Sequence, residues 1–251
     1  MKKIVFAAAC ALAVLMFSVI AYAQPVAVDA IDAETPERKP TSSGGIGVNS
    51  YSGNTTQLDV NGTQITGHWQ GYYGNISGEI TLDDGDSNTL FAWTLASASG
   101  EIYAANTSAT VHWGNITCIN LTNGTGDSEN LTAASKINAT TLDQQYYISQ
   151  ADEDRFSATF SGFYSGSFSV GGVTIDSADA CPRAYMYVSN ATQSTDYQEV
   201  LLFDNLSALV FTTIIEPDTT VGFDGNEWNF EMLVAQQNAS AGTYYFYVEL
   251  S

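Results

Sequence analysis

The string Glu227-Trp228-Asn229-Phe230-Glu231 has the residue types that an acid–base mechanism needs. Residues two apart on a strand share a face, so Glu227 and Glu231 would flank Asn229 on one side. Two carboxyl groups on one face can act as nucleophile and general acid in glycoside hydrolysis. The alternative, which we favour, is an ordinary strand whose polar residues face water while Trp228 and Phe230 face the core.

The same string resembles the E-x-D-x-E arrangement of laminarinase-type jelly-roll glycosidases, with Asn229 in the place of the central acid. This resemblance implies Glu227 and Glu231 as the catalytic pair of a glycoside hydrolase. Other enzyme classes have less support, because the two histidines, His68 and His112, stand far apart and without a G-x-S-x-G motif. Zinc-protease, paired C-x-x-C and phosphate-loop motifs are also missing from the sequence. We therefore expect a protein that is not an enzyme.

The acidic run DGDSN at 84–88 places oxygen ligands at alternate positions, as the opening of a calcium loop does. Leu95 stands at the twelfth position, where an EF-hand loop has a bidentate glutamate. The acids at 152–154 would add ligands if they fold nearby. The sequence suggests no cofactor other than a structural calcium ion, and the alternative to that site is an acidic hairpin turn. The ligands of the calcium site would be Asp84, Asp86 and Asn88.

Aromatic and glycine residues alternate in the segment 67–74 (GHWQGYYG). Exposed on a strand, Trp69, Tyr72 and Tyr73 would stack on sugar rings, as in carbohydrate-binding modules. Buried, Trp69 and Tyr73 would share a face and supply rings to the core of a sandwich. We favour core packing.

The N-terminus has the three parts of an export signal. Lys2 and Lys3 precede the apolar stretch 4–20, and Ala21-Tyr22-Ala23 supplies small residues for cleavage before Gln24. The alternative is an uncleaved membrane anchor. No later stretch is long and apolar enough to span a membrane, so we expect no transmembrane segment after cleavage and an extracellular or cell-surface location.

Charge and cysteine content agree with export. Cleavage leaves five basic against 27 acidic residues, a formal charge of −22 for the mature chain. Such a charge repels nucleic acid and anionic membrane surfaces. Cys118 and Cys181 remain, and in an oxidising compartment we expect them to form a disulfide, the alternative being two buried thiols.

Asparagine occurs mostly in N-glycosylation sequons. Twelve of the 16 Asn begin an N-x-Ser/Thr triplet, against about three expected by chance from the Ser/Thr content. Such sites mark exposed backbone, and five crowd into 115–138. The pattern predicts a glycoprotein and favours an archaeal cell surface. The predicted sites are Asn54, Asn61, Asn75, Asn106, Asn115, Asn120, Asn123, Asn130, Asn138, Asn190, Asn205 and Asn238.

The segments 67–78 and 244–250 resemble uncharacterised exported archaeal surface proteins. The likeness extends over most of the chain after the N-terminal segment. It implies the location and a β fold, and it brings no catalytic residue.

Short apolar runs about ten residues apart predict an all-β fold, a β-sandwich of Greek-key or jelly-roll type with at most one short helix, at 141–149. We expect a signal peptide at 1–23, a flexible linker at 24–53 and one β-sandwich domain at 54–251, the alternative being two small β-domains. Hairpin turns are expected at 61–62, 84–85 and 224–225. The predicted strands cover residues 64–73, 78–82, 89–95, 101–105, 109–113, 155–160, 166–175, 184–188, 198–202, 208–215, 227–235 and 243–250.

These features favour a structural or interaction role at the cell surface, as an envelope component, adhesin or filament subunit. The expected partners are envelope or extracellular components, or further copies of the chain, since exposed strand edges pair readily. In the sharpest form of this hypothesis, residues 24–53 complete the sheet of a neighbouring subunit. The alternatives are a carbohydrate-binding module and the glycoside hydrolase described above.

Overall fold

The computed structural model describes residues 24–39, 47–107, 111–119, 121, 139–204, 208–218, 220–237 and 242–251. The predicted signal peptide lies outside them, and so does most of the sequon-rich stretch 115–138. Within the described ranges, no helix has the length and apolar character needed to cross a membrane. The fold is an all-β sandwich, as the spacing of the apolar runs predicts.

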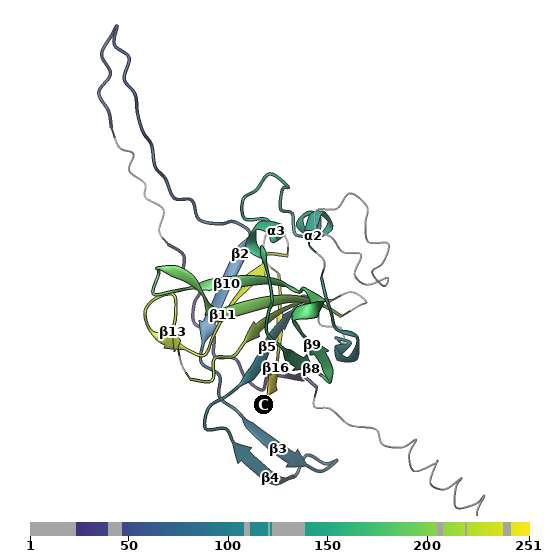
Figure 1. The fold of residues 1–251 in the computed structure, drawn as a ribbon. Helices are drawn as coiled ribbons and strands as arrows, with labels where there is room; N and C mark the ends of the chain where they lie inside the picture. Colours follow the sequence, from purple (N-terminus) through teal and green to yellow (C-terminus); the bar gives the residue numbers. More distant parts are fainter. Residues whose placement is uncertain are drawn as a thin grey trace, which may run out of the picture.

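An eight-stranded antiparallel sheet forms the centre of the molecule (Figure 1). Seven strands follow the order β1-β16-β5-β12-β11-β10-β7, and β6 pairs with β11 beside this path. Apolar residues occupy both faces: on β5, Ile102 and Ala104 belong to one core, Tyr103 and Ala105 to the other. The strands are β1 (Val26–Ala27), β5 (Gly100–Ala105), β6 (Thr117–Cys118), β7 (Gly162–Phe163), β10 (Pro182–Val188), β11 (Thr192–Phe203), β12 (Leu209–Ile214) and β16 (Tyr245–Leu250).

The first face of this sheet is covered by a second antiparallel pair, β2 (Trp69–Gly74) with β15 (Phe230–Ala235). Met232 and Val234 of β15 are 1% exposed, because they lie between the two sheets. Two short helices, α2 (Ala139–Gln145) and α3 (Phe156–Thr159), add to the same core. Their buried side chains help to hold Trp69, whose ring lies 5.0 Å from that of Phe156.

The opposite face is covered by a small hairpin, β8 (Phe168–Val170) with β9 (Val173–Ile175), and by the short helix η1 (Trp113–Asn115). The predicted disulfide is confirmed: Cys118 of β6 is bonded to Cys181, which directly precedes β10, with 4.8 Å between their Cα atoms. The bridge spans 63 residues, and closing a loop of that length stabilises the folded chain by about 4 kcal/mol in the chain-entropy model.

Several local predictions are wrong. The segment 155–160, predicted as a strand, contains the helix α3, so the described residues form two short α-helices where at most one was expected. The reason is a tertiary contact: the buried Asp143 carboxylate accepts a hydrogen bond from the Phe156 amide at the start of the helix. The predicted strand 109–113 ends in η1, and the strand 166–175 is divided by a turn at Gly171 and Gly172, which both have positive φ.

The remaining short elements are η2 (Ser177–Asp179), β13 (Thr220–Val221) and β14 (Glu227–Trp228). The predicted turn at 224–225 is confirmed, because it joins β13 to β14. No hairpin forms at 61–62, and the predicted strand 64–73 begins only at Trp69.

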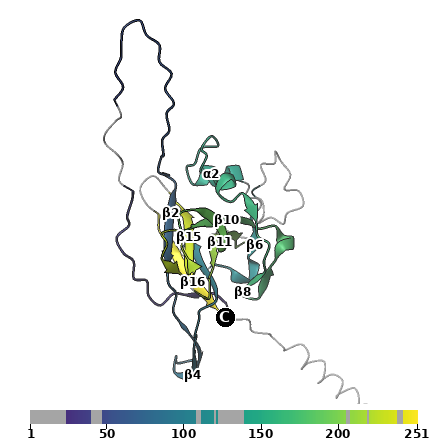
Figure 2. The same ribbon diagram turned by 60° about the vertical axis from the view of Figure 1, so that its left-hand side comes forward.

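Two parts of the chain project from the body at opposite ends (Figures 1 and 2). Residues 47–67 form a long extended excursion that leads into β2, and the hairpin of β3 (Glu79–Asp83) and β4 (Thr89–Thr94) follows directly after β2. Between them lies the sandwich. The segment 24–53, predicted as a linker, also contributes β1, which pairs Val26 and Ala27 with Val248 and Tyr247 of the C-terminal strand.

Candidate functional site

The projecting hairpin β3–β4 is a two-stranded sheet of its own among the described residues. Ile80 lies directly opposite Trp93, and Leu82 lies directly opposite Phe91. Directly opposed residues of an antiparallel pair share a face, so these four apolar side chains form one continuous surface, here called the apolar hairpin face. The turn between the strands falls at Asp84–Asn88, where the sequence predicts it.

The apolar hairpin face is exposed. Its side chains are 39% (Ile80), 50% (Leu82), 55% (Phe91) and 49% (Trp93) accessible, although the rings of Phe91 and Trp93 lie only 4.8 Å apart. An isolated two-stranded hairpin is only marginally stable in water and normally packs its apolar face on another element. This face therefore has the composition of a buried surface without a covering element in the described part of the chain.

The hairpin turn holds the three residues of the predicted calcium site. Asp84 Oδ1 accepts hydrogen bonds from the backbone amides of Asp86 (2.9 Å) and Asn88 (2.8 Å). The Asn88 side-chain amide donates to both Asp84 oxygens, at 3.1 and 2.9 Å, and this bond lowers the pKa of the Asp84 carboxyl. The side chains of Asp84 and Asn88 are thus hydrogen-bonded to each other. Asp152 and Asp154 lie beside His68 instead of at this turn, and the calcium site stays a prediction.

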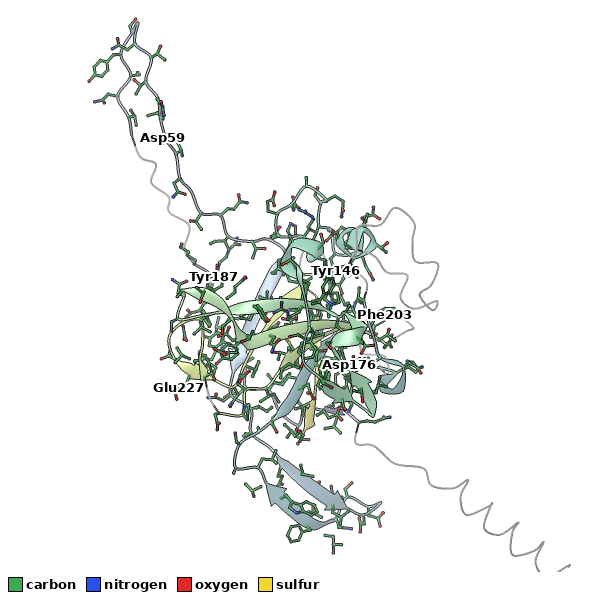
Figure 3. The ribbon with its side chains drawn as sticks, in the orientation of Figure 1. Asp59, Tyr146, Asp176, Tyr187, Phe203 and Glu227 are labelled. Atoms are coloured by element: carbon green, nitrogen blue, oxygen red, sulfur yellow. A yellow bond between two sulfur atoms is a disulfide. The ribbon has the colours of Figure 1, made fainter. Side chains whose placement is uncertain are left out.

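The extended segment, residues 47–67, exposes a second group of apolar side chains. Val48, Tyr51, Leu58 and Val60 are 61%, 68%, 58% and 89% accessible. Asp59 is the one charged residue of the segment, and Figure 3 places it far from the body. The sequence predicts that the irregular region ends at residue 53. In the structure this region continues to the start of β2, because the residues between form no hydrogen-bonded ladder with the sheet.

The three predicted ligand aromatics occupy different environments. Trp69 packs in the core, with its ring 5.0 Å from Phe156, and its indole nitrogen donates to the Asp154 carbonyl at 2.6 Å. Tyr72 is 37% exposed and its ring contacts Phe246. Tyr73 is 50% exposed. The expected burial of Tyr73 is wrong, because its ring packs on Trp228 and on Phe223, which is itself 39% exposed.

The string that resembles a glycosidase motif is broken. Asn229 falls between β14 and β15, where its amide donates to the Glu216 carbonyl at 2.9 Å. Glu227 is exposed at the periphery (Figure 3), whereas Glu231 is 4% exposed and accepts a hydrogen bond from the Phe223 amide. Burial raises the Glu231 pKa to about 7. The expectation that the polar residues face water is therefore wrong for Asn229 and Glu231.

Sequence reasoning missed a group of buried acids on the central sheet. Glu101 of β5 lies directly opposite Glu249 of β16, and the Tyr103 hydroxyl donates to both carboxylates at 3.5 and 3.4 Å. Burial, and then the charge of Glu249, raises the Glu101 pKa to about 8. Burial raises the pKa of the fully buried Glu199, although the hydrogen bond that it accepts from the Leu233 amide acts to lower it. Each of these glutamates stands beside apolar residues within a predicted strand, and this placement was the sequence signal for a buried acid.

Six predicted glycosylation sites lie among the described residues. Five of them are exposed, namely Asn54, Asn61, Asn75, Asn115 and Asn190. Asn106 is half-buried: its Nδ2 donates to the Tyr146 hydroxyl at 2.9 Å, and its Oδ1 accepts from the Leu209 amide at 3.2 Å. The other six sites, Asn120, Asn123, Asn130, Asn138, Asn205 and Asn238, lie outside the described residues.

Comparisons of this chain with models of known protein families, with curated proteins and with solved structures gave no match. The functional argument therefore depends on the chain's own residues.

Proposed function

We propose that this chain is an exported structural subunit of a cell-surface assembly, a glycoprotein that binds further copies of itself head to tail. The observation that carries the proposal is the apolar hairpin face, formed by Ile80, Leu82, Phe91 and Trp93. The disulfide and the exposed sequons are compatible with a location outside the cell. The proposed role is structural and involves no catalytic step.

The occupant that we propose for the apolar hairpin face is the extended segment of a second copy. That segment offers Val48, Tyr51, Leu58 and Val60 as exposed apolar side chains. It carries a single charge, Asp59, so it can lie against an acidic hairpin with little repulsion. An extended segment can also add as a strand to the exposed edge of a sheet, which is a common mode of peptide recognition.

The placement of the two surfaces favours an open assembly. The segment and the hairpin leave the body at opposite ends (Figures 1 and 2). A contact between two different surfaces of identical subunits is heterologous, and it extends into a filament unless rotation closes a ring. Each subunit would then use its hairpin on one neighbour and its segment on the next.

Mixing two assembly-deficient variants tests this arrangement. Phe91→Ser with Trp93→Ser removes the hairpin surface, and Leu58→Asp with Val60→Asp removes the segment surface. We expect each variant alone to be monomeric and an equimolar mixture to form a heterodimer through the one intact pair of surfaces. Light scattering after size-exclusion chromatography measures the masses. As a matched control, Ala92→Ser on the other face of β4 should assemble like the wild type.

A wild-type chain that stays monomeric at high concentration would overturn the proposal. A mixture that stays monomeric while the wild type assembles would show that the surfaces do not bind each other.

The second candidate function is carbohydrate binding, and the adjacent exposed rings of Phe91 and Trp93 favour it. Trp113 is buried, and Trp69 and Trp228 are partly buried in core contacts, so the four tryptophans do not form an exposed row. A glycan array separates the two functions. Specific glycan binding by the wild type that is lost in Trp93→Ser, without any change of oligomeric state, would favour a carbohydrate-binding module.

A further inference from the structure

A cluster of potential metal ligands lies at the base of the extended segment. His68, Asp152 and Asp154 each offer one ligand atom, and these atoms all lie within 4.8 Å of one another. His68 Nε2 lies 3.3 Å from Asp152 Oδ2. The ligands come from two segments 84 or more residues apart, so the sequence gives no spacing motif for them.

The backbone around the cluster is held by the core. Next to His68, the Trp69 ring packs on Phe156, and its Nε1 donates to the Asp154 carbonyl at 2.6 Å. The Thr66 hydroxyl donates to Asp154 Oδ2, and the Ser149 amide donates to Asp152 Oδ2 at 2.9 Å. These contacts orient the ligands in the way that outer-shell hydrogen bonds orient ligands in metal sites.

The local charge is also unbalanced. Among the ion pairs of the described residues, neither Asp152 nor Asp154 contacts a lysine or an arginine. The nearby Arg155 guanidinium donates to the backbone carbonyl of Asp152 at 2.9 Å. The two carboxylates outnumber the one imidazole, so the half-buried cluster keeps a net negative charge, which a divalent cation would neutralise.

We propose that His68, Asp152 and Asp154 form a divalent-metal site, with Zn²⁺ as its preferred ion. One imidazole and two carboxylates match zinc, whose oxygen and nitrogen ligands lie at about 2.0–2.2 Å. Ligand atoms around such an ion are about 3.3 Å apart, so only small side-chain rotations are needed. Calcium fits less well, since it takes six to eight oxygen ligands. Water completes the zinc coordination.

The site would fasten the start of β2 to the loop between α2 and α3. Residues 47–67 leave the body directly before this point. A bound ion would therefore fix the base of the extended segment. The inference rests on the ligand geometry and is independent of the proposed assembly.

Isothermal titration calorimetry of the chelator-treated mature chain with Zn²⁺ tests the site. We expect one equivalent to bind, with Ca²⁺ at least about tenfold weaker, and the melting temperature to rise with Zn²⁺. His68→Gln and Asp154→Asn should each weaken binding at least about tenfold, as the loss of one of three protein ligands requires.

His112→Gln is the matched control, because His112 Nδ1 lies 3.4 Å from Asp204 Oδ2 but is not part of a three-ligand cluster in the described residues. It should bind Zn²⁺ like the wild type. Circular dichroism and melting without metal verify that each variant folds. Zn²⁺ binding that is unchanged in folded His68→Gln, or Ca²⁺ binding as tight as Zn²⁺ binding, would overturn the assignment.

Discussion

Two antiparallel strand pairs of this chain have the same local design and different surroundings. In β2–β15, the side chains of Met232 and Val234 are 1% exposed because the pair packs on the central sheet. In β3–β4, Ile80, Leu82, Phe91 and Trp93 lie on one face, and 39–55% of each residue is exposed to water. The sequence pattern specifies an apolar face in both pairs, and only the tertiary structure specifies what covers it.

The difference shows where the two pairs obtain their stability. The β2–β15 pair belongs to the cooperative core, so its side chains contribute to the free energy of unfolding of the monomer. The exposed apolar residues of β3–β4 contribute little to the free energy of unfolding of the monomer, and they would contribute mainly to binding.

The largest effect should follow from Met232→Ala in the covered pair. Removing most of a fully buried methionine leaves a cavity between the two sheets, and such changes cost about 2–5 kcal/mol. Urea denaturation of the monomer, followed by tryptophan fluorescence, measures the change in free energy of unfolding. A loss below about 0.5 kcal/mol would mean that β2–β15 is no better packed than the projecting hairpin.

A pH titration sharpens the comparison, because the carboxyl groups with raised pKa lie in the body. Burial raises the pKa of Glu101 to about 8 and that of Glu231 to about 7, from the 4.5 of an ordinary glutamate carboxyl. The folded chain thus holds protons that the unfolded chain releases, so their stabilising effect is complete below about pH 4.5 and is lost as the pH rises through 7 to 8.

We therefore expect the melting temperature to fall between pH 5 and pH 8, with a loss of stability of about 3 kcal/mol or more. Glu101→Gln should flatten this slope, because the amide keeps a polar group and cannot ionise. Glu79→Gln, on the exposed hairpin, is the control and should keep the wild-type slope. A melting temperature that rises over this range would contradict the assignment of these carboxyl groups.

The smallest effect should follow from Trp93→Ala on the apolar hairpin face. Half of this side chain is already in water, so we expect the free energy of unfolding of the monomer to change by less than about 0.5 kcal/mol. The same urea titration as for Met232→Ala gives the value. A cost above about 2 kcal/mol would show that the hairpin packs on the body in solution.

The sequence predicts those features that depend on local pattern. Alternating apolar residues located β3, β4, β5 and β15, and the two cysteines that follow the predicted signal peptide indicated the disulfide. The turn at 84–85 was predicted from Asp-Gly, which tolerates positive φ, although the residue that adopts positive φ in this turn is Ser87. Each of these predictions depends on a window of about ten residues or on the residue types alone.

Features that depend on distant contacts could not be predicted in this way. The helix α3 uses the carboxylate of Asp143, 13 residues earlier, for its first amide. Asn229 interrupts a strand because its side chain binds the Glu216 carbonyl. The candidate metal cluster joins His68 to Asp152 and Asp154 only after β2 has packed beside the helical loop. These long-range contacts produce no periodicity or motif in the sequence from which they could be predicted.

The hydrogen bonds of Asn106 have a consequence for the order of events during biogenesis. Its amide nitrogen, the atom that would carry a sugar, is engaged by Tyr146 in the native protein, whereas Asn75 is exposed. A transferase that meets the folded chain would modify Asn75 and leave Asn106 bare, and one that acts on the emerging polypeptide would reach both. The ratio of glycan occupancy at Asn106 to that at Asn75 would therefore show whether sugar transfer precedes or follows folding.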